Sequence, residues 1–109
     1  FFVFAERAGA VVGYSCFGPI PCTRTSYDLY WIAVDPAAQG GGLGRALLRE
    51  TEEEVRRRGG TRLYAETSGR PQYAPTRGFY QRTGFDRAEV LEDFYDVGDD
   101  RVTYCKVLA

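Results

Sequence analysis

The chain has 109 residues, and its 14 lysine and arginine residues nearly balance 15 aspartate and glutamate residues, for a formal net charge of −1. This balance argues against binding to nucleic acid, and no apolar stretch approaches the roughly 20 residues that cross a bilayer, which argues against a membrane protein. The three cysteines form no Cys-x-x-Cys pair and histidine is absent, so we expect free, buried thiols and no metal site. We therefore predict a soluble, cytoplasmic protein with a single domain over residues 1–109.

The first third of the chain predicts three strands. Segments 2–5 and 10–17 are rich in β-forming residues and flank a short turn, which is typical of a hairpin. Pro19 and Pro21 end the second strand because proline donates no hydrogen bond to a sheet. Segment 27–34 is apolar or aromatic at nearly every position, which indicates a central strand covered on both faces.

The rest of the chain predicts, in order, helix 42–58, strand 63–67, helix 75–83, and strands 85–91 and 102–108. Apolar residues recur at helical spacing in the first helix, and Gly59 and Gly60 end it. Pro75 suits the first turn of the second helix. We expect the acidic segment 92–100 to form a loop between the last two strands. The predicted order is therefore β-β-β-α-β-α-β-β.

A glycine turn joins the third strand to the first helix and is the most informative segment of the chain. It runs Gln39-Gly40-Gly41-Gly42-Leu43-Gly44 and continues into Arg45 and Ala46. Glycines let successive backbone N–H groups converge on an anion, and the helix adds unsatisfied donors and the positive end of its dipole. The turn lacks the Gly-Lys-Ser/Thr ending of a P-loop and the third glycine of a dinucleotide fingerprint. It follows the pattern Gln-x-x-Gly-x-Gly.

This pattern resembles the coenzyme A pyrophosphate loop of the GNAT superfamily of N-acetyltransferases. A second segment, Phe79-Tyr80-Gln81-Arg82-Thr83-Gly84-Phe85, is similar to the Phe-Tyr-x-x-x-Gly-Phe block of that family. The resemblance extends over about residues 11–107. It implies an α+β fold in three α/β layers, the acyl-CoA N-acyltransferase fold, with a mixed, mostly antiparallel sheet and a splayed central pair of parallel strands. The predicted order matches this fold from its second strand onward, so the N-terminal strand and the helices after it are expected to be missing.

The resemblance implies that acetyl-CoA is the cosubstrate and that an amine attacks its thioester directly, without a metal or an acyl-enzyme intermediate. Backbone N–H groups of the glycine turn would hold the pyrophosphate, and the end of the third strand would bind the pantetheine arm through its backbone. The candidate coenzyme-binding residues are Ile32, Ala33, Val34, Gln39, Gly40, Gly41, Gly42, Leu43, Gly44 and Arg45.

Two catalytic roles also follow from the resemblance. Tyr80 occupies the position of the tyrosine that protonates the departing thiolate, and a phenol with an ordinary pKa near ~10 is protonated at neutral pH. Glu66 is the candidate general base, with Asp28, Tyr30 and ordered water as rivals. Tyr73 stands where the ribosomal-protein subgroup of the family often carries asparagine, which argues against transferring that subgroup's specificity for peptide N-termini.

The acceptor stays open between a small-molecule amine and a protein amine, because no residue pattern describes it. Two other functions also stay open: a non-catalytic acyl-CoA-binding sensor or interaction module, and a nucleotide-phosphate binder. Edge strands and the aromatic start of the chain favour a homodimer.

Overall fold

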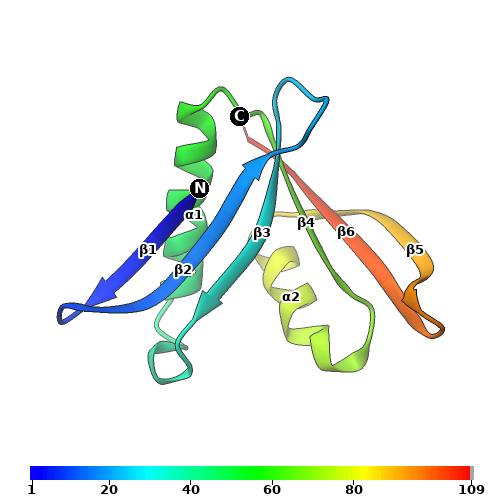
Figure 1. Ribbon diagram of the computed structural model, residues 1–109. Coiled ribbons are helices and arrows are strands. Elements are labelled where there is room, and N and C mark those ends of the chain that lie inside the picture. Colours follow the sequence, from blue (N-terminus) through cyan, green and yellow to red (C-terminus); the bar gives the residue numbers. More distant parts are fainter. Residues whose placement is uncertain (109) are drawn as a thin grey trace. The chain divides into compact units, whose positions relative to one another are not determined.

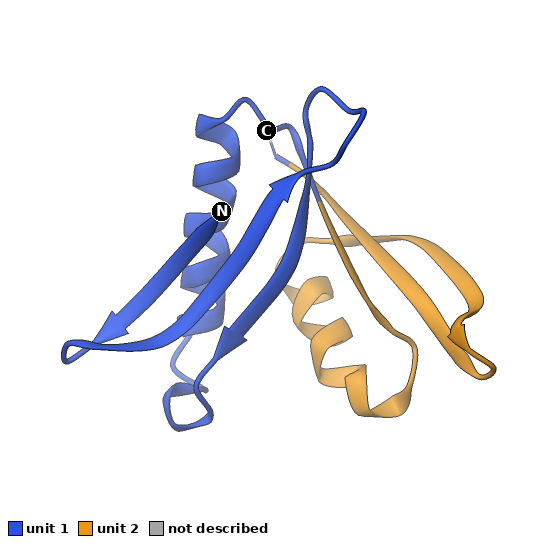
Figure 2. Cartoon of the chain, viewed as in Figure 1, with its two compact units in different colours: residues 1–63, 108–109 blue, residues 64–107 orange. Residues whose placement is uncertain are grey.

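The computed structural model describes residues 1–108, which contain six strands and two α-helices (Figure 1). In chain order these are β1 (Phe2–Arg7), β2 (Ala10–Pro19), β3 (Ser26–Val34), α1 (Leu43–Arg57), β4 (Arg62–Ser68), α2 (Ala74–Arg82), β5 (Asp86–Asp96) and β6 (Asp99–Val107). The order of elements is the predicted one. The chain divides into two compact units: unit 1 holds residues 1–63 and 108, and unit 2 holds residues 64–107 (Figure 2).

Unit 1 is an antiparallel sheet in the order β1-β2-β3, with α1 packed against all three strands (Figure 1). The β1–β2 turn uses two left-handed residues, Ala8 and Gly9, which suit a tight hairpin. The buried polar side chains of Ser15 and Thr51 have hydrogen-bond partners inside the unit. Their hydroxyls share a hydrogen bond of 2.7 Å, and Thr51 also donates to the Leu47 carbonyl. The buried apolar side chains of this unit include Phe17, Leu29, Leu47, Leu48, Val55 and Leu63.

The end of α1 requires glycine for reasons of space. The Gly60 N–H donates to the Val55 carbonyl at 2.8 Å, which closes the last turn of the helix. A Cβ atom on Gly60 would lie 2.3 Å from Val55 Cγ1 and 2.8 Å from Tyr27 Cδ1. Any larger residue at position 60 would therefore force the Val55 and Tyr27 side chains to move. The predicted stop of the helix at this glycine pair is confirmed.

Unit 2 has the strand order β4-β6-β5, with α2 contacting β5. Tyr80 on α2 is buried with the rings of Phe85 and Tyr104, whose centroids lie 5.2 Å and 5.5 Å away. Lys106 Nζ donates to the Thr83 carbonyl at 2.7 Å, which satisfies an acceptor at the C-terminal end of α2. Aromatic packing and this one lysine thus attach the helix to its sheet.

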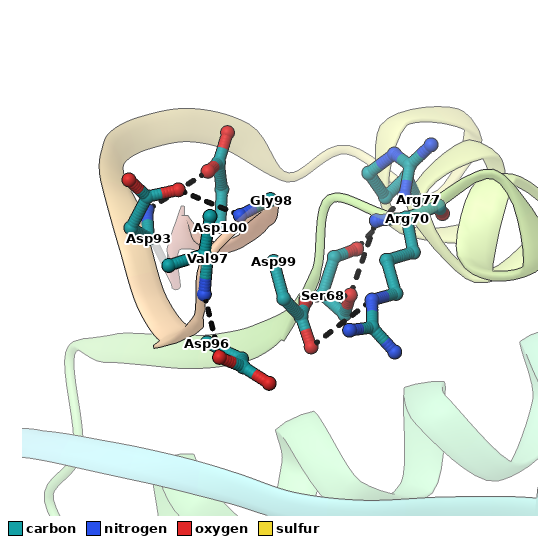
Figure 3. Close-up of polar contacts among 9 residues, drawn as sticks. All are labelled: Ser68, Arg70, Arg77, Asp93, Asp96, Val97, Gly98, Asp99 and Asp100. Atoms are coloured by element: carbon teal, nitrogen blue, oxygen red, sulfur yellow. Dashed lines mark hydrogen bonds and ion pairs between the residues drawn. The ribbon is translucent and has the colours of Figure 1, made fainter.

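The predicted acidic loop over 92–100 is wrong, because β5 extends to Asp96 and β6 begins at Asp99. The connection is a tight turn at Val97 and Gly98, and the strand register shifts between Leu91 and Asp96. Aspartate disfavours regular strands, but here its carboxylates accept backbone N–H groups that a continuous ladder would otherwise have used. Figure 3 shows these contacts, in which Gly98 N donates to Asp93, Asp93 N to Asp100 and Val97 N to Asp96, all over 2.8–3.0 Å.

Two further expectations about strands need correction. Pro19 is the last residue of β2 instead of lying beyond it. The third strand is not covered on both faces, because Tyr30 and Trp31 are 55% and 60% exposed. A register shift pairs Cys16 with Trp31 and Phe17 with Leu29, so Tyr30 is the extra residue of a β-bulge, which turns its side chain out of the regular alternation.

The cysteines are free, as expected, but they are not buried: Cys22 is exposed, and Cys16 and Cys105 are half-buried. Within residues 1–108, no helix has the length and apolar character needed to cross a membrane. The same residues contain no group of three or more side chains arranged to hold a metal ion.

Candidate functional site

In unit 1, the candidate coenzyme segment begins where β3 ends. The β3 residues Ile32, Ala33 and Val34 pair with β2 and are half-buried, so their side chains pack while their backbone forms the end of the strand. The next residue, Asp35, accepts the Ala37 N–H at 2.9 Å and starts a single turn of 3-10 helix. This turn redirects the chain toward the glycines.

Gln39 braces the glycine turn against the strand. Its side-chain amide donates to the Val34 carbonyl at 3.0 Å. The bond ties the start of the turn to the last residue of β3, five positions earlier in the chain. This contact holds the start of the glycine turn against the end of β3.

The glycines satisfy a requirement of backbone conformation. Gly40 and Gly42 have φ angles of +89° and +78°, which side chains with a Cβ atom adopt only with strain. A Cβ on either residue would meet nothing within 4 Å, so conformation and not lack of space explains the glycines at these two positions. Gly42 is the N-cap residue of α1, and no side chain caps this helix. Its first-turn N–H groups, which include those of Leu43, Gly44 and Arg45, are therefore left for an external acceptor.

Arg7 lies beside the same turn and was missed in the sequence. The position of a Cβ on Gly41 would be 4.0 Å from Arg7 Nη2, so the guanidinium lies close to the glycine backbone. The predicted hairpin could have indicated this position. Antiparallel pairing places Arg7, the last residue of β1, at the same end of the sheet as the last residue of β3. Arg7 beside the turn and the exposed Arg45 in the first turn of α1 add positive charges near the glycines, and Asp35 carries a negative charge at the end of β3.

In unit 2, Tyr80 lies in the last turn of α2. Its side chain is only 5% exposed and packs against Phe79 as well as the two rings described above. Burial raises the pKa of Tyr80 to about 12, because the low-dielectric surroundings disfavour the phenolate. Tyr80 therefore stays protonated throughout the neutral range, as a proton donor must. The same burial also fits a residue that packs the helix.

Glu66 is an exposed residue of β4, between the buried Ala65 and Thr67, and it forms an ion pair. Its Oε1 atom is 2.9 Å from Nη2 of Arg101 on β6. Burial and the charge of Glu66 raise the pKa of Tyr95, and Arg101 opposes this effect. Glu66, Tyr95 and Arg101 thus act on one another electrostatically within unit 2. The rivals for the role of base lie on β3 in unit 1: Asp28 is half-buried, and Tyr30 covers Gly18.

The segment before α2 is fixed by a polar network (Figure 3). Ser68 bonds to Asp99 and accepts the Arg70 N–H, and Arg70 Nε lies 3.4 Å from an Asp99 oxygen. Arg77 donates to the carbonyls of Ser68 and Arg70, both at 2.8 Å. These arginines hold the chain that leads from β4 into the α2 helix. The exposed Tyr73 lies at the N-cap of that helix.

Comparison with known proteins shows the family. Residues 1–85 match the model of the acetyltransferase (GNAT) family, so the chain belongs to this family. The N-alpha-acetyltransferase RimI of Mycobacterium tuberculosis is 36% identical over 104 residues, which are 94% of this chain and 63% of that protein. The [ribosomal protein bS18]-alanine N-acetyltransferase of Escherichia coli K12 is 38% identical over 73 residues, 67% of this chain and 48% of the relative. The chain thus spans less than two thirds of these curated relatives.

Solved structures confirm the predicted fold class. A GNAT-family acetyltransferase structure from Desulfovibrio desulfuricans superimposes with a TM-score of 0.97 at 54% identity, over 99% of this chain and 69% of that one. The ribosomal-protein-alanine N-acetyltransferase of Brucella melitensis gives 0.82 at 32% identity, over 98% and 68%. The acetyltransferase yncA of Salmonella typhimurium, solved with acetyl-CoA, gives 0.84 at 26% identity, over 99% and 64%. The fold is therefore the α+β acyl-CoA N-acyltransferase fold, with a mixed sheet of six strands and two helices.

Proposed function

We propose that this chain binds acetyl-CoA and takes part in direct transfer of its acetyl group to an amine, as one N-acetyltransferase domain over residues 1–109. The observation that carries the proposal is the uncapped N-terminus of α1 behind a glycine turn with left-handed residues. Membership of the GNAT family, in which the yncA structure holds acetyl-CoA, supports the same assignment.

Unit 1 would bind the coenzyme mainly through its backbone. The N–H groups of residues 40–45 would receive the diphosphate, Gln39 would keep the turn in place, and Arg7 would add a positive charge. The backbone of Ile32, Ala33 and Val34 would pair with the pantetheine arm as a strand does. An N–H group of this segment would also stabilise the oxyanion that forms on the thioester carbonyl.

Unit 2 would supply the groups that move protons. The amine nitrogen must be neutral to attack the carbonyl carbon, and Glu66 would accept its proton directly or through water. Collapse of the tetrahedral intermediate breaks the carbon–sulfur bond, and Tyr80 would protonate the sulfur that leaves. The raised pKa of Tyr80 fits this role, since the phenol still carries its proton when the thiolate forms. No step in this mechanism requires a metal.

The acceptor is proposed only as a class, an amine on a small molecule or a protein. The relatives from M. tuberculosis and E. coli are named for N-alpha-acetylation and for a ribosomal-protein alanine, which makes an alanine-initiated peptide the first acceptor to test.

We also propose a cytoplasmic location and a homodimer. The homodimer is proposed because Phe2 and Phe4 stack as exposed side chains on β1. Light scattering distinguishes a dimer from a monomer.

Calorimetry with acetyl-CoA, followed by a thiol-release assay, tests the proposed function. We expect one coenzyme bound per chain and release of free CoA when an alanine-initiated peptide, spermidine or an aminoglycoside is added. Absence of any binding heat with folded protein would contradict the assignment. Displacement of acetyl-CoA by ATP at similar affinity would instead indicate a general nucleotide-phosphate binder.

The alternative is an acyl-CoA-binding sensor or interaction module without catalysis. It is favoured by the packing of Tyr80, whose buried ring would serve the stability of α2 even if no proton moved. Tight binding of acetyl-CoA with no transfer to any amine of the panel would support this alternative and contradict the enzymatic proposal.

A further inference from the structure

We propose that Arg101 is a positioning residue, which fixes the carboxylate of Glu66 in the orientation needed to accept a proton. This inference rests on the proposed role of Glu66 as general base and goes beyond it by adding a residue from another strand. Arg101 lies on β6, and Glu66 lies on β4, its neighbour in unit 2.

Three contacts hold the Arg101 side chain. Nη2 lies 2.9 Å from Glu66 Oε1, Nε lies 3.3 Å from Thr103 Oγ1, and the guanidinium carbon lies 4.9 Å from the centroid of the Phe94 ring. The Arg101 side chain is 24% exposed and the Glu66 side chain 39%, so the pair is partly shielded and still reachable by a substrate. A guanidinium oriented by a ring and a hydroxyl binds a carboxylate with more defined geometry than a free side chain.

The Phe94 ring is itself presented by an irregular stretch of β5. The register shift between Leu91 and Asp96 places residues 92–95 outside the regular pairing. Backbone-to-carboxylate bonds involving Asp93 and Asp100 hold this stretch, as Figure 3 shows. The exposed Phe94 ring therefore lies on a supported backbone and can serve as a platform for Arg101.

The contact with Arg101 is expected to orient the Glu66 carboxylate. A glutamate on a strand surface has three rotatable side-chain bonds, and most of its rotamers point the carboxylate away from any one proton. Contact with a fixed guanidinium through Oε1 restricts these rotamers before the acceptor arrives. Because proton transfer depends on the position of the base within a fraction of an ångström, loss of this restraint slows the chemical step.

A double-mutant cycle tests the proposal with acetyl-CoA and an alanine-initiated peptide as substrates. We expect Arg101→Gln to lower kcat about tenfold without changing the Kd for acetyl-CoA, and Arg101→Lys to recover part of the loss. In a Glu66→Gln background, Arg101→Gln should cause no further loss, because the residue acts only through Glu66. An equal loss in both backgrounds would overturn the proposal. Arg70→Gln is the matched control, since it removes the neighbouring ion pair with Asp99 and leaves Glu66 untouched.

A measurement without turnover separates this proposal from the proposed function. Side-chain relaxation of 13C-labelled Glu66 reports its motion on the picosecond-to-nanosecond timescale, whether or not the chain transfers acetyl groups. We expect Glu66 to be restricted in the wild type and in Arg70→Gln, and to become mobile in Arg101→Gln. Equal mobility in all three proteins would overturn the positioning role, even if acetyl transfer is demonstrated. Loss of transfer in the wild type with restricted Glu66 would contradict only the enzymatic assignment.

Discussion

The two units of this chain use different parts of the polypeptide for their proposed tasks. In unit 1 the candidate site consists of backbone N–H groups exposed by left-handed glycines and an uncapped helix. The chief requirement on the sequence there is glycine, which has no side chain. In unit 2 the candidate groups are side chains, Tyr80 inside an aromatic cluster and Glu66 in an ion pair with Arg101. A change in unit 1 should therefore weaken coenzyme binding, whereas a change in unit 2 should slow proton transfer and leave binding intact.

The largest expected effect is on turnover and belongs to unit 2. Tyr80→Phe should lower kcat by about 100-fold or more, because the leaving sulfur loses its proton donor, and should leave the Kd for acetyl-CoA unchanged. Steady-state kinetics and calorimetry measure the two quantities. Tyr104→Phe removes a hydroxyl from the same buried cluster and should leave kcat within about twofold of the wild type. If the affinity for acetyl-CoA fell together with kcat in Tyr80→Phe, Tyr80 would contribute to coenzyme binding, contrary to this prediction.

The second effect is on stability at high pH and also belongs to unit 2. The pKa of Tyr80 is about 12 in the folded chain and near ~10 when unfolded, so between these values the unfolded chain releases the proton first. The free energy of unfolding should therefore be unaffected by Tyr80 below pH ~10 and fall by about 3 kcal/mol as the pH rises to ~12. Urea unfolding at several pH values measures this loss. An equally steep loss in Tyr80→Phe would assign it to other groups.

The third effect is on coenzyme affinity and belongs to unit 1. Gly42→Ala should weaken acetyl-CoA binding about tenfold, because a Cβ at a φ of +78° strains the N-cap and displaces the first-turn N–H groups. Gly9→Ala is a matched control, since Gly9 has a φ of +81° and equally open surroundings in the β1–β2 turn. Both variants should lose about 1–2 kcal/mol of stability. Equal coenzyme affinity in both variants would exclude the glycine turn from the site.

The smallest effect separates backbone from side-chain binding within unit 1. Arg45→Gln should weaken acetyl-CoA binding by no more than about threefold at physiological salt, because its exposed charge is screened and the helix N–H groups remain. Calorimetry at low and high salt measures this change. A loss comparable with that of Gly42→Ala would show that side-chain charge, and not the backbone, dominates coenzyme binding in unit 1.

Local signals in the sequence predicted most of the fold. Gly59 and Gly60 marked the end of α1, and the glycine turn marked its start, because both depend on backbone conformations that only particular residues adopt. The last two strands were predicted, but their extension through residues 92–100 was missed. The aspartates of this segment bind backbone N–H groups within the hairpin, and their composition alone is typical of a solvated loop. The bulge at Tyr30 was also invisible, since a register shift has no signature in one strand.

The candidate site was predicted only where its residues are close in sequence. The turn over 39–45 is one continuous motif, whereas Arg7 reaches it only through hairpin pairing and Arg101 reaches Glu66 only through the order of the strands. Contacts between side chains from distant segments depend on register, which single-sequence periodicity does not determine. The roles of Tyr80 and Glu66 stay predictions that the kinetic experiments address.

Coenzyme binding by the glycine-turn backbone can be followed directly by titrating the 15N-labelled chain with coenzyme A and recording its amide NMR signals. We expect the amide protons of residues 40–45 to shift downfield as they donate to the diphosphate. Desulfo-pantetheine, which lacks phosphate, should leave these signals in place. Binding of coenzyme A without any change in the signals of residues 40–45 would contradict the claim that this backbone holds the coenzyme.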